Sequence, residues 1–464
     1  MLQVLAFGET ALRTGERIRQ VAQIVAQHAR HADSLPLVIV SAMTGVTDRL
    51  CALTRCAREG KPQECARLLE AIRQQHRDAA DTAIHNAEQY HLFLPTLEEA
   101  LLELEHEVMH VQVLPYGSTD IALHTARVVA WGERLAVLLV AAAIMDQSIQ
   151  ATPVRDEVLI TTFPWQQEPP CLDELVSVPV LMSETRARAR RLLLPLLAAQ
   201  IVPVIAGKVG RTGQGIITMQ GEHGVDYAAA LLAEMLHASA VEISTEHDGV
   251  LTADPAVVSD ASSLPALSYE EAWQLASFGS SSHVLHPSVL MPLAARNIPL
   301  RVRPLDAPEL PGTLISASSS SSLTTALALH RQVALIHVKG RARHGLSKSL
   351  ALLLRLVSQS GLTPLMLHMS ASQTCSFLIE ERAAEAVLRA LGESPEPWDV
   401  RCQRGLAACL CLGSSITRNP LNLAYALVAL ADERVVVHSQ GYADLGMILV
   451  VQTEDGAVSY THLR

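Results

Sequence analysis

The chain has 464 residues, which is too long for one ordinary domain, so two or three domains are expected. Its hydrophobic content of 49% excludes a disordered protein, and its formal charge of −11, with no basic face, excludes a nucleic-acid binder. Aromatic residues make up only 3%, so the core should be aliphatic, which suits helices packed on buried parallel strands.

No uninterrupted apolar run reaches the roughly 18–20 residues that a membrane-spanning helix needs. The first eight residues lack the basic and apolar regions of a signal peptide. Of the eight cysteines only Cys409 and Cys411 lie close together, and a C-x-C pair in a strand pattern is a weak metal signal. We therefore expect a cytoplasmic protein with reduced thiols, no metal site and no membrane partner.

The N-terminal part alternates short apolar runs with helical periodicity. The runs at 37–40 and 201–205 end in small residues and lead towards helices, which predicts a parallel α/β sheet with ligands at the carboxyl ends of its strands. Apolar residues spaced by three and four predict helix over 66–111. The histidines of this stretch are expected on a solvated helical face rather than around a metal: His76, His85, His91, His106 and His110.

The C-terminal part holds an internal repeat after a serine-rich linker, placed at 316–331. The first copy predicts strands and helices in the order 333–338, 346–358 (helix), 365–369, 376–379 and 383–391 (helix). The second copy predicts them in the order 406–412, 422–430 (helix), 435–438 and 446–451, and it stops without a closing helix. We expect a first domain at 1–315 and two regulatory modules at 332–396 and 397–464.

Five segments, in order, resemble motifs of the aspartokinase family. They are SAMTGVTD at 41–48, GERL at 132–135, DYAAALLA at 226–233, DGVLTADP at 248–255 and FGSSSHVLHP at 278–287. The resemblance implies an α/β fold: a carbamate-kinase-like amino-acid-kinase domain, which is a sandwich built on a parallel sheet, followed by two ferredoxin-like βαββαβ ACT domains.

The resemblance also implies an activity, the ATP-dependent phosphorylation of the side-chain carboxylate of L-aspartate to 4-phospho-L-aspartate, with Mg²⁺. By resemblance, Asp226 is catalytic. The residues assigned to the amino acid are Ser41, Thr47, Glu133 and, at the position of the family's arginine, Glu222. Those assigned to the nucleotide are Gly8, Thr245, Glu246, Asp254 and His283.

The phosphate-binding motifs depart from the family in their charge. Both reacting groups are anionic, so catalysis depends on cations and backbone N–H groups that neutralise them. The residues that stand where the family has a cation are Ala6, Glu222, Ala256 and His283, and Glu9 replaces a glycine. These changes predict impaired or diverged phosphoryl transfer.

Lys208 stands where the family has an aromatic residue beside the substrate, so its ammonium is a candidate replacement for the lost catalytic lysine. A solvated surface lysine is the alternative. Three functions stay open: an aspartokinase of low activity, a silent paralogue that senses an amino acid as a regulatory or partner subunit, and a kinase-fold enzyme with another acceptor.

The repeated modules resemble ACT domains, in which effectors bind at a helix N-terminus against a facing strand. By resemblance the effector is lysine or threonine, and the chains associate as a homodimer or a higher oligomer. The residues expected at the effector are Gly345, Ser370 and Gln440.

Overall fold

The computed structural model describes residues 2–31, 35–115, 120–154, 157–162, 175–176, 178–221, 223–278, 285–317, 326–340, 351, 354–355, 364–369, 374–393, 398–413, 416, 420–443 and 445–463. The chain divides into two compact units. The first contains Met1–Val250 and Val284–Ser318, and the second contains Leu251–His283 and Ser319–Arg464. Residues 251–283 therefore group with the C-terminal part, although the sequence placed them in the first domain. The domain boundaries themselves stay a prediction.

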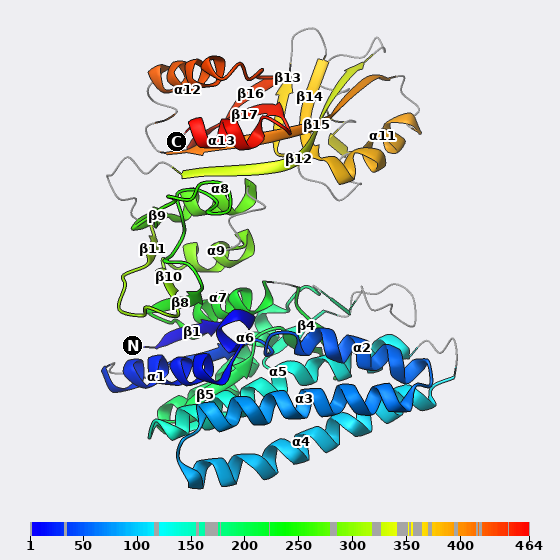
Figure 1. The fold of residues 1–464 in the computed structure, drawn as a ribbon, viewed down its shortest axis with the longest axis vertical. Helices are drawn as coiled ribbons and strands as arrows, with labels where there is room; N and C mark the ends of the chain where they lie inside the picture. Colours follow the sequence, from blue (N-terminus) through cyan, green and yellow to red (C-terminus); the bar gives the residue numbers. More distant parts are fainter. Residues whose placement is uncertain are drawn as a thin grey trace. The chain divides into compact units, whose positions relative to one another are not determined.

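The first unit is built on a largely parallel sheet (Figure 1). Its strands run in the order β3-β5-β2-β1-β8-β10-β11. Their bounds are β1 Gln3–Phe7, β2 Leu37–Val40, β3 Ala151–Pro153, β5 Val202–Ala206, β8 Ala240–Thr245, β10 Leu300–Pro304 and β11 Thr313–Ser316. Neighbours pair in parallel, except β10 with β11. This confirms the predicted α/β class.

Helices cover the sheet because its strands are apolar on both faces. Leu5 and Phe7 of β1 pack in one core with five helices: α1 Gly15–His31, α2 Val46–Arg58, α3 Pro62–Ala83, α4 Ala87–Val113 and α5 Ile121–Asp146. Val4 and Ala6 alternate onto the opposite face. There α7 (Gly224–Leu236) contacts β1 and β8, and it packs against α6 (Met182–Ala198) and α9 (Pro287–Ala294). A small sheet of β4 (Leu159–Thr161), β6 (Val209–Thr212) and β7 (Ile217–Met219) completes the unit.

The helical stretch predicted over 66–111 is two helices. The first helix, α3, ends at Ala83, and Asn86 is the N-cap of the second. Its side chain accepts hydrogen bonds from the backbone N–H groups of Glu88 and Gln89 at the start of α4. The expectation that its histidines are solvated is wrong for His76, which is fully buried and has Nδ1 2.8 Å from the carbonyl oxygen of Ile72.

One helix of the described part of the chain, α5, is long and apolar enough to cross a membrane by length and composition alone. The test is weak for a single helix, and 89% of the apolar window of α5 is buried inside the first unit. That burial is what the central helix of a folded α/β unit shows.

The second unit contains an antiparallel sheet in the order β13-β14-β12-β15-β17-β16. The strands are β12 Ala326–Gly340, β13 Met366–Met369, β14 Thr374–Glu380, β15 Trp398–Leu412, β16 Ser439–Ala443 and β17 Gly446–Gln452. The unit also contains β9 Ala266–Ser268, α8 Tyr269–Phe278, α11 Ala384–Gly392, α12 Pro420–Asp432 and α13 Gly456–His462.

The two long strands, β12 and β15, each serve both repeated modules. Residues 333–339 pair with β14, and residues 333–340 pair with the first half of β15, whereas residues 326–330 pair with residues 408–412. The register shifts between these halves, at His330 and Val333. Residues 326–330 therefore belong to the sheet of the second module, although they precede the first module in the chain.

Three local predictions for these modules are wrong. Residues 326–331, expected in the linker, are strand, because they pair with β15. The strand expected at 435–438 begins at Ser439, where pairing with β17 starts. The second module does have its closing helix, α13, in which the buried Tyr460 donates a hydrogen bond to the carbonyl oxygen of Leu327 (2.8 Å). The helix expected at 346–358 lies largely outside the described residues.

Candidate functional site

The candidate site lies at the carboxyl edge of the large sheet of the first unit. Phe7 is in register with Val40 of β2 and with Ser244 of β8, so these three parallel strands end side by side. The chain leaves them at Gly8, Ser41 and Thr245, all predicted site residues. Ligands of open parallel sheets bind at this edge.

Glu133 is the most completely buried acid at this edge, with 2% of its surface exposed. It belongs to α5, and its Oε2 accepts hydrogen bonds from the backbone N–H groups of Lys208 (2.8 Å) and Val209 (3.2 Å). Its Oε1 is buried and has no hydrogen-bond partner among the described residues. Burial raises the pKa of Glu133 to about 7, against the opposing effect of the Lys208 backbone hydrogen bond and charge. A buried carboxylate with one free oxygen suits a ligand ammonium group.

Lys208 lies in the turn between β5 and β6, against the first turn of α7. Two glycines allow this approach: a Cβ on Gly207 would lie 2.8 Å from the Cα of Val225, and one on Gly224 would lie 2.9 Å from the Cγ of Lys208. Asp226, in the same helical turn, has its pKa raised to about 7 by burial, and the charge of Lys208 opposes this rise. The structure thus brings the predicted residues Lys208, Glu133 and Asp226 into one electrostatic group.

The loop between β2 and α2 forms the next part of the edge. Ser41 is buried and donates its backbone N–H to the carbonyl oxygen of Phe7 (3.1 Å), while Thr47 is exposed in the first turn of α2. Gly45 precedes α2 with a φ of +75°, which favours glycine. Its backbone N–H donates to Oε1 of Glu9 (3.0 Å), and the Thr44 hydroxyl donates to the Glu9 carbonyl oxygen (2.9 Å). The Glu9 carboxylate thus accepts the hydrogen bond of one backbone N–H group at the N-terminus of α2.

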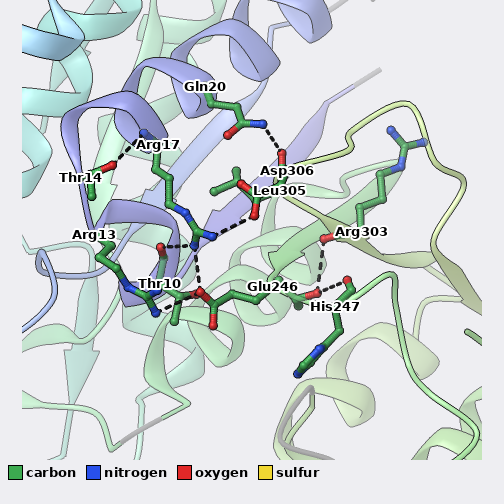
Figure 2. Close-up of polar contacts among 11 residues, drawn as sticks. Thr10, Arg13, Thr14, Arg17, Gln20, Glu246, His247, Arg303, Leu305 and Asp306 are labelled. Carbon is green, nitrogen blue, oxygen red and sulfur yellow. Dashed lines mark hydrogen bonds and ion pairs between the residues drawn. The ribbon is translucent and has the colours of Figure 1, made fainter. Parts of the chain in front are cut away.

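An ion-pair cluster closes the edge beyond β8 and β10 (Figure 2). Oε1 of Glu246, a predicted nucleotide residue, lies 3.0 Å from guanidinium nitrogens of both Arg13 and Arg17. Arg17 also contacts Oδ2 of Asp306 (2.8 Å) and the carbonyl oxygen of Thr10 (2.9 Å). Two guanidinium groups at the end of β8 are therefore already paired with carboxylates.

Two further predicted residues frame this cluster. The Thr245 hydroxyl donates to the carbonyl oxygen of His247 (2.9 Å) and lies 3.4 Å from that of Arg303, so it holds the ends of β8 and β10 together. A Cβ on Gly8 would meet no atom within 4 Å, so the space beside the β1 turn is open.

The other predicted site residues are not part of this group. Asp254 lies in the second unit, where its backbone N–H donates to the Tyr460 hydroxyl (2.7 Å), and Gln440 is exposed on β16. Glu222, His283, Gly345 and Ser370 lie outside the described residues.

Sequence reasoning missed Arg13, Arg17 and Asp306. The two arginines are four residues apart around the start of α1, which looks like an ordinary solvated helical face. Asp306 is 289 residues away from Arg17 in the chain. Nothing in the pattern links these positions before the strands are aligned.

Within the residues that the structure describes, no group of three or more His, Cys, Asp or Glu side chains is arranged to hold a metal ion. The nearby acids Glu246 and Asp306 are paired with arginines.

Known proteins resemble this chain along its whole length. The amino acid kinase family model matches residues 1–304. Lysine-sensitive aspartokinase 3 of Escherichia coli is 33% identical over 337 residues, covering 72% of this chain and 68% of that protein. A bifunctional aspartokinase/homoserine dehydrogenase 2 of Arabidopsis thaliana is 27% identical over 485 residues, covering 100% of this chain and 50% of that protein. The chain thus spans about half the length of the bifunctional relatives that it matches.

The fold of the chain also matches a solved structure. The crystal structure of E. coli aspartokinase III in complex with aspartate and ADP has a TM-score of 0.79 at 24% identity, covering 100% of this chain and 99% of that one. The chain belongs to the amino acid kinase family. The extent of its likeness to aspartokinase 3 places it, within that family, among the aspartokinases. The fold expected from the five motifs, an amino-acid-kinase domain followed by ACT domains, is confirmed.

Proposed function

We propose that this chain is an aspartokinase-type protein that binds L-aspartate or a related amino acid and phosphorylates its side-chain carboxylate slowly. The observation that carries the proposal is Glu133, whose buried Oε1 lacks a partner among the described residues while Oε2 is fixed by two backbone N–H groups. A buried carboxylate without a full set of partners lowers the stability of the fold, and such groups occur mainly at ligand-binding and catalytic sites. The substrate ammonium group would complete its contacts.

We call Glu133, Lys208 and Asp226 the acceptor group. Its lysine supports the binding of a negatively charged group of the same ligand. The charge of Lys208 acts on both Glu133 and Asp226, and its ammonium is the candidate replacement for the family's catalytic lysine, whose position is Ala6 here. A related E. coli enzyme has been solved with aspartate and ADP, which makes this pair the first ligands to test.

The slow turnover follows from the nucleotide side. ATP with Mg²⁺ would lie along Gly8, Thr245 and the Arg13–Arg17 pair, and the ion would supply charge neutralisation to the transferring phosphoryl group. Here Ala6 provides no cation, and the Glu9 carboxylate takes the Gly45 N–H group. Losing one charge-assisted contact costs on the order of 10²–10³ in rate.

A hydroxamate assay with L-aspartate and Mg·ATP tests the proposal on the full chain. We expect a low rate in the parent, none in Glu133→Ala, and a rise of at least about tenfold in the double variant Ala6→Lys/Glu9→Gly. Asp146→Asn, which changes an acid outside the site, is the control. A double variant no faster than the parent would contradict the assignment of the lost charges.

A second candidate is a silent, amino-acid-sensing partner subunit. The observation favouring it is the ion-pair cluster, in which Glu246 and Asp306 occupy both arginines at the nucleotide edge. Calorimetric titration separates the two candidates: micromolar binding of Mg·ATP would exclude the silent subunit, and aspartate binding without ATP binding would favour it.

We propose three further properties by likeness. Lysine or threonine binds the second unit near Gln440 and positions 345 and 370, because a related E. coli enzyme has been solved with lysine and aspartate. The chains associate through the ACT modules, and the protein acts in the cytoplasm. A shift in melting temperature with lysine or threonine, and the mass in solution, would test the first two properties.

A further inference from the structure

A cavity of about 110 Å³ lies in the first unit, where it is lined by residues of α4, α5 and the start of β6. Its apolar wall includes Val137 and Leu138 of α5, Val154 after β3 and Val209 at the start of β6. Glu133, Lys208 and Asp226 are not among its lining residues. The cavity is therefore separate from the proposed acceptor site.

One residue of the cavity wall has a buried polar atom without a partner in the described part of the chain. Trp131 lines the cavity and is 7% exposed, and its indole Nε1 has no hydrogen-bond partner among the described residues. An unsatisfied buried donor costs stability and normally marks a missing acceptor.

A positive group lies beside this donor. The guanidinium carbon of Arg134 is 5.2 Å from the centre of the Trp131 ring, and its Nη2 donates to Oε1 of Glu157 (2.5 Å). Arg134 and Glu157 both line the cavity, as does a second acid, Glu103. A guanidinium has five N–H donors, so the Glu157 contact leaves capacity for a second anionic acceptor.

We propose that this cavity binds a short, branched aliphatic carboxylate. Its carboxylate accepts from the Trp131 indole N–H and shares the Arg134 guanidinium, and its branched end packs against Val137, Val154 and Val209. An engineered apolar cavity of about 150 Å³ accommodates benzene with its six carbons, so this smaller one encloses about four to five non-hydrogen atoms, the size of the branched aliphatic part of such a ligand. The inference stands independently of the proposed kinase function.

One residue of the cavity wall also contacts the acceptor group, so a ligand in the cavity can affect the hydrogen bonding of Glu133. Val209 lines the cavity, and its backbone N–H donates to Oε2 of Glu133 (3.2 Å). Glu133 and Arg134 are also consecutive on α5.

The test uses 3-methylbutanoate as the probe and the Trp131 indole N–H as the reporter. In the full chain labelled with ¹⁵N-tryptophan, we expect a saturable downfield shift of the resonance that Trp131→Phe removes. The uncharged analogue 3-methylbutan-1-ol and the chainless analogue acetate should bind at least about tenfold more weakly. Equal binding of the alcohol, or no shift up to saturating probe, would overturn the proposal.

Two variants test the cavity itself by calorimetry. Trp131→Phe keeps the ring and removes the donor, so the probe should bind about five- to tenfold more weakly. Val137→Phe fills the cavity and should abolish binding, whereas Val128→Ile, on another part of α5, should not. Glu133→Gln separates the two proposals: it should remove aspartate binding and leave probe binding within about twofold. Probe binding unchanged in Val137→Phe would refute the site.

Discussion

Replacing Glu133 by glutamine should stabilise the protein at neutral and alkaline pH while removing its amino-acid ligand. Burial raises the pKa of this carboxyl from its ordinary value of 4.5 to about 7. Folding therefore favours the protonated form, so its contribution to stability is present in full below pH 4.5 and is lost as the pH rises through about 7. Glutamine stays neutral throughout this range.

The size of the effect follows from the pKa. At about 1.4 kcal/mol per pKa unit, a rise from 4.5 to about 7 corresponds to about 3 kcal/mol. The free energy of unfolding of Glu133→Gln should exceed that of the parent by up to this amount at pH 8. The two proteins should be nearly equal near pH 4.5, where both side chains are neutral. Glutamine can still accept the Lys208 N–H, so the local structure should survive.

Urea unfolding of both proteins between pH 4.5 and 8.5 measures this difference. Glu234→Gln is the matched control, because Glu234 is also buried but has its pKa lowered. Burial acts upward on that pKa, and the hydrogen bonds to Arg186 and Arg296 outweigh it. The stabilisation by Glu234 is therefore present above its ordinary pKa of 4.5, so Glu234→Gln should be less stable than the parent by a nearly constant amount over this pH range. A Glu133→Gln difference that does not grow with pH would refute the reasoning.

Three further predictions concern the edge of the sheet. Glu9→Gln should tighten the binding of Mg·ATP about tenfold in calorimetry at low salt, since it removes the carboxylate on the Gly45 N–H, and unchanged binding would contradict this. Arg17→Met should lower the free energy of unfolding by about 1–2 kcal/mol, whereas Arg13→Met, at a 48% exposed side chain, should cost less than about 0.5 kcal/mol; equal losses would disagree. Lys208→Met should raise the pKa of Asp226 further above about 7, followed by ¹³C NMR of the carboxyl groups, and a lower value would count against their proximity.

The sequence was sufficient for features that depend on short stretches of chain. Apolar runs at 37–40 and 201–205 are strands because they are buried on both faces, and the glycine at 45 has the positive φ that its motif needs. The five motifs identified the family, and the replaced cations could be read directly. The repeat was visible as well, since each module has its own pattern.

Other features depended on tertiary structure because they join residues far apart in the chain. No local pattern could show that 326–330 completes the second module, since a strand's partner is set by the whole sheet. Lys208, Glu133 and Asp226 were each predicted as site residues, but their common electrostatic environment depends on two glycines that let the β5–β6 turn approach α7. Likewise, the missing cations are evident from the sequence, but the pairing of Arg13 and Arg17 with Glu246 and Asp306 required the ends of β8 and β10 to lie side by side. The identity and charge of each residue can be read from the sequence. Which charges are paired, and which could contact a ligand, depends on residues that only the tertiary structure brings together.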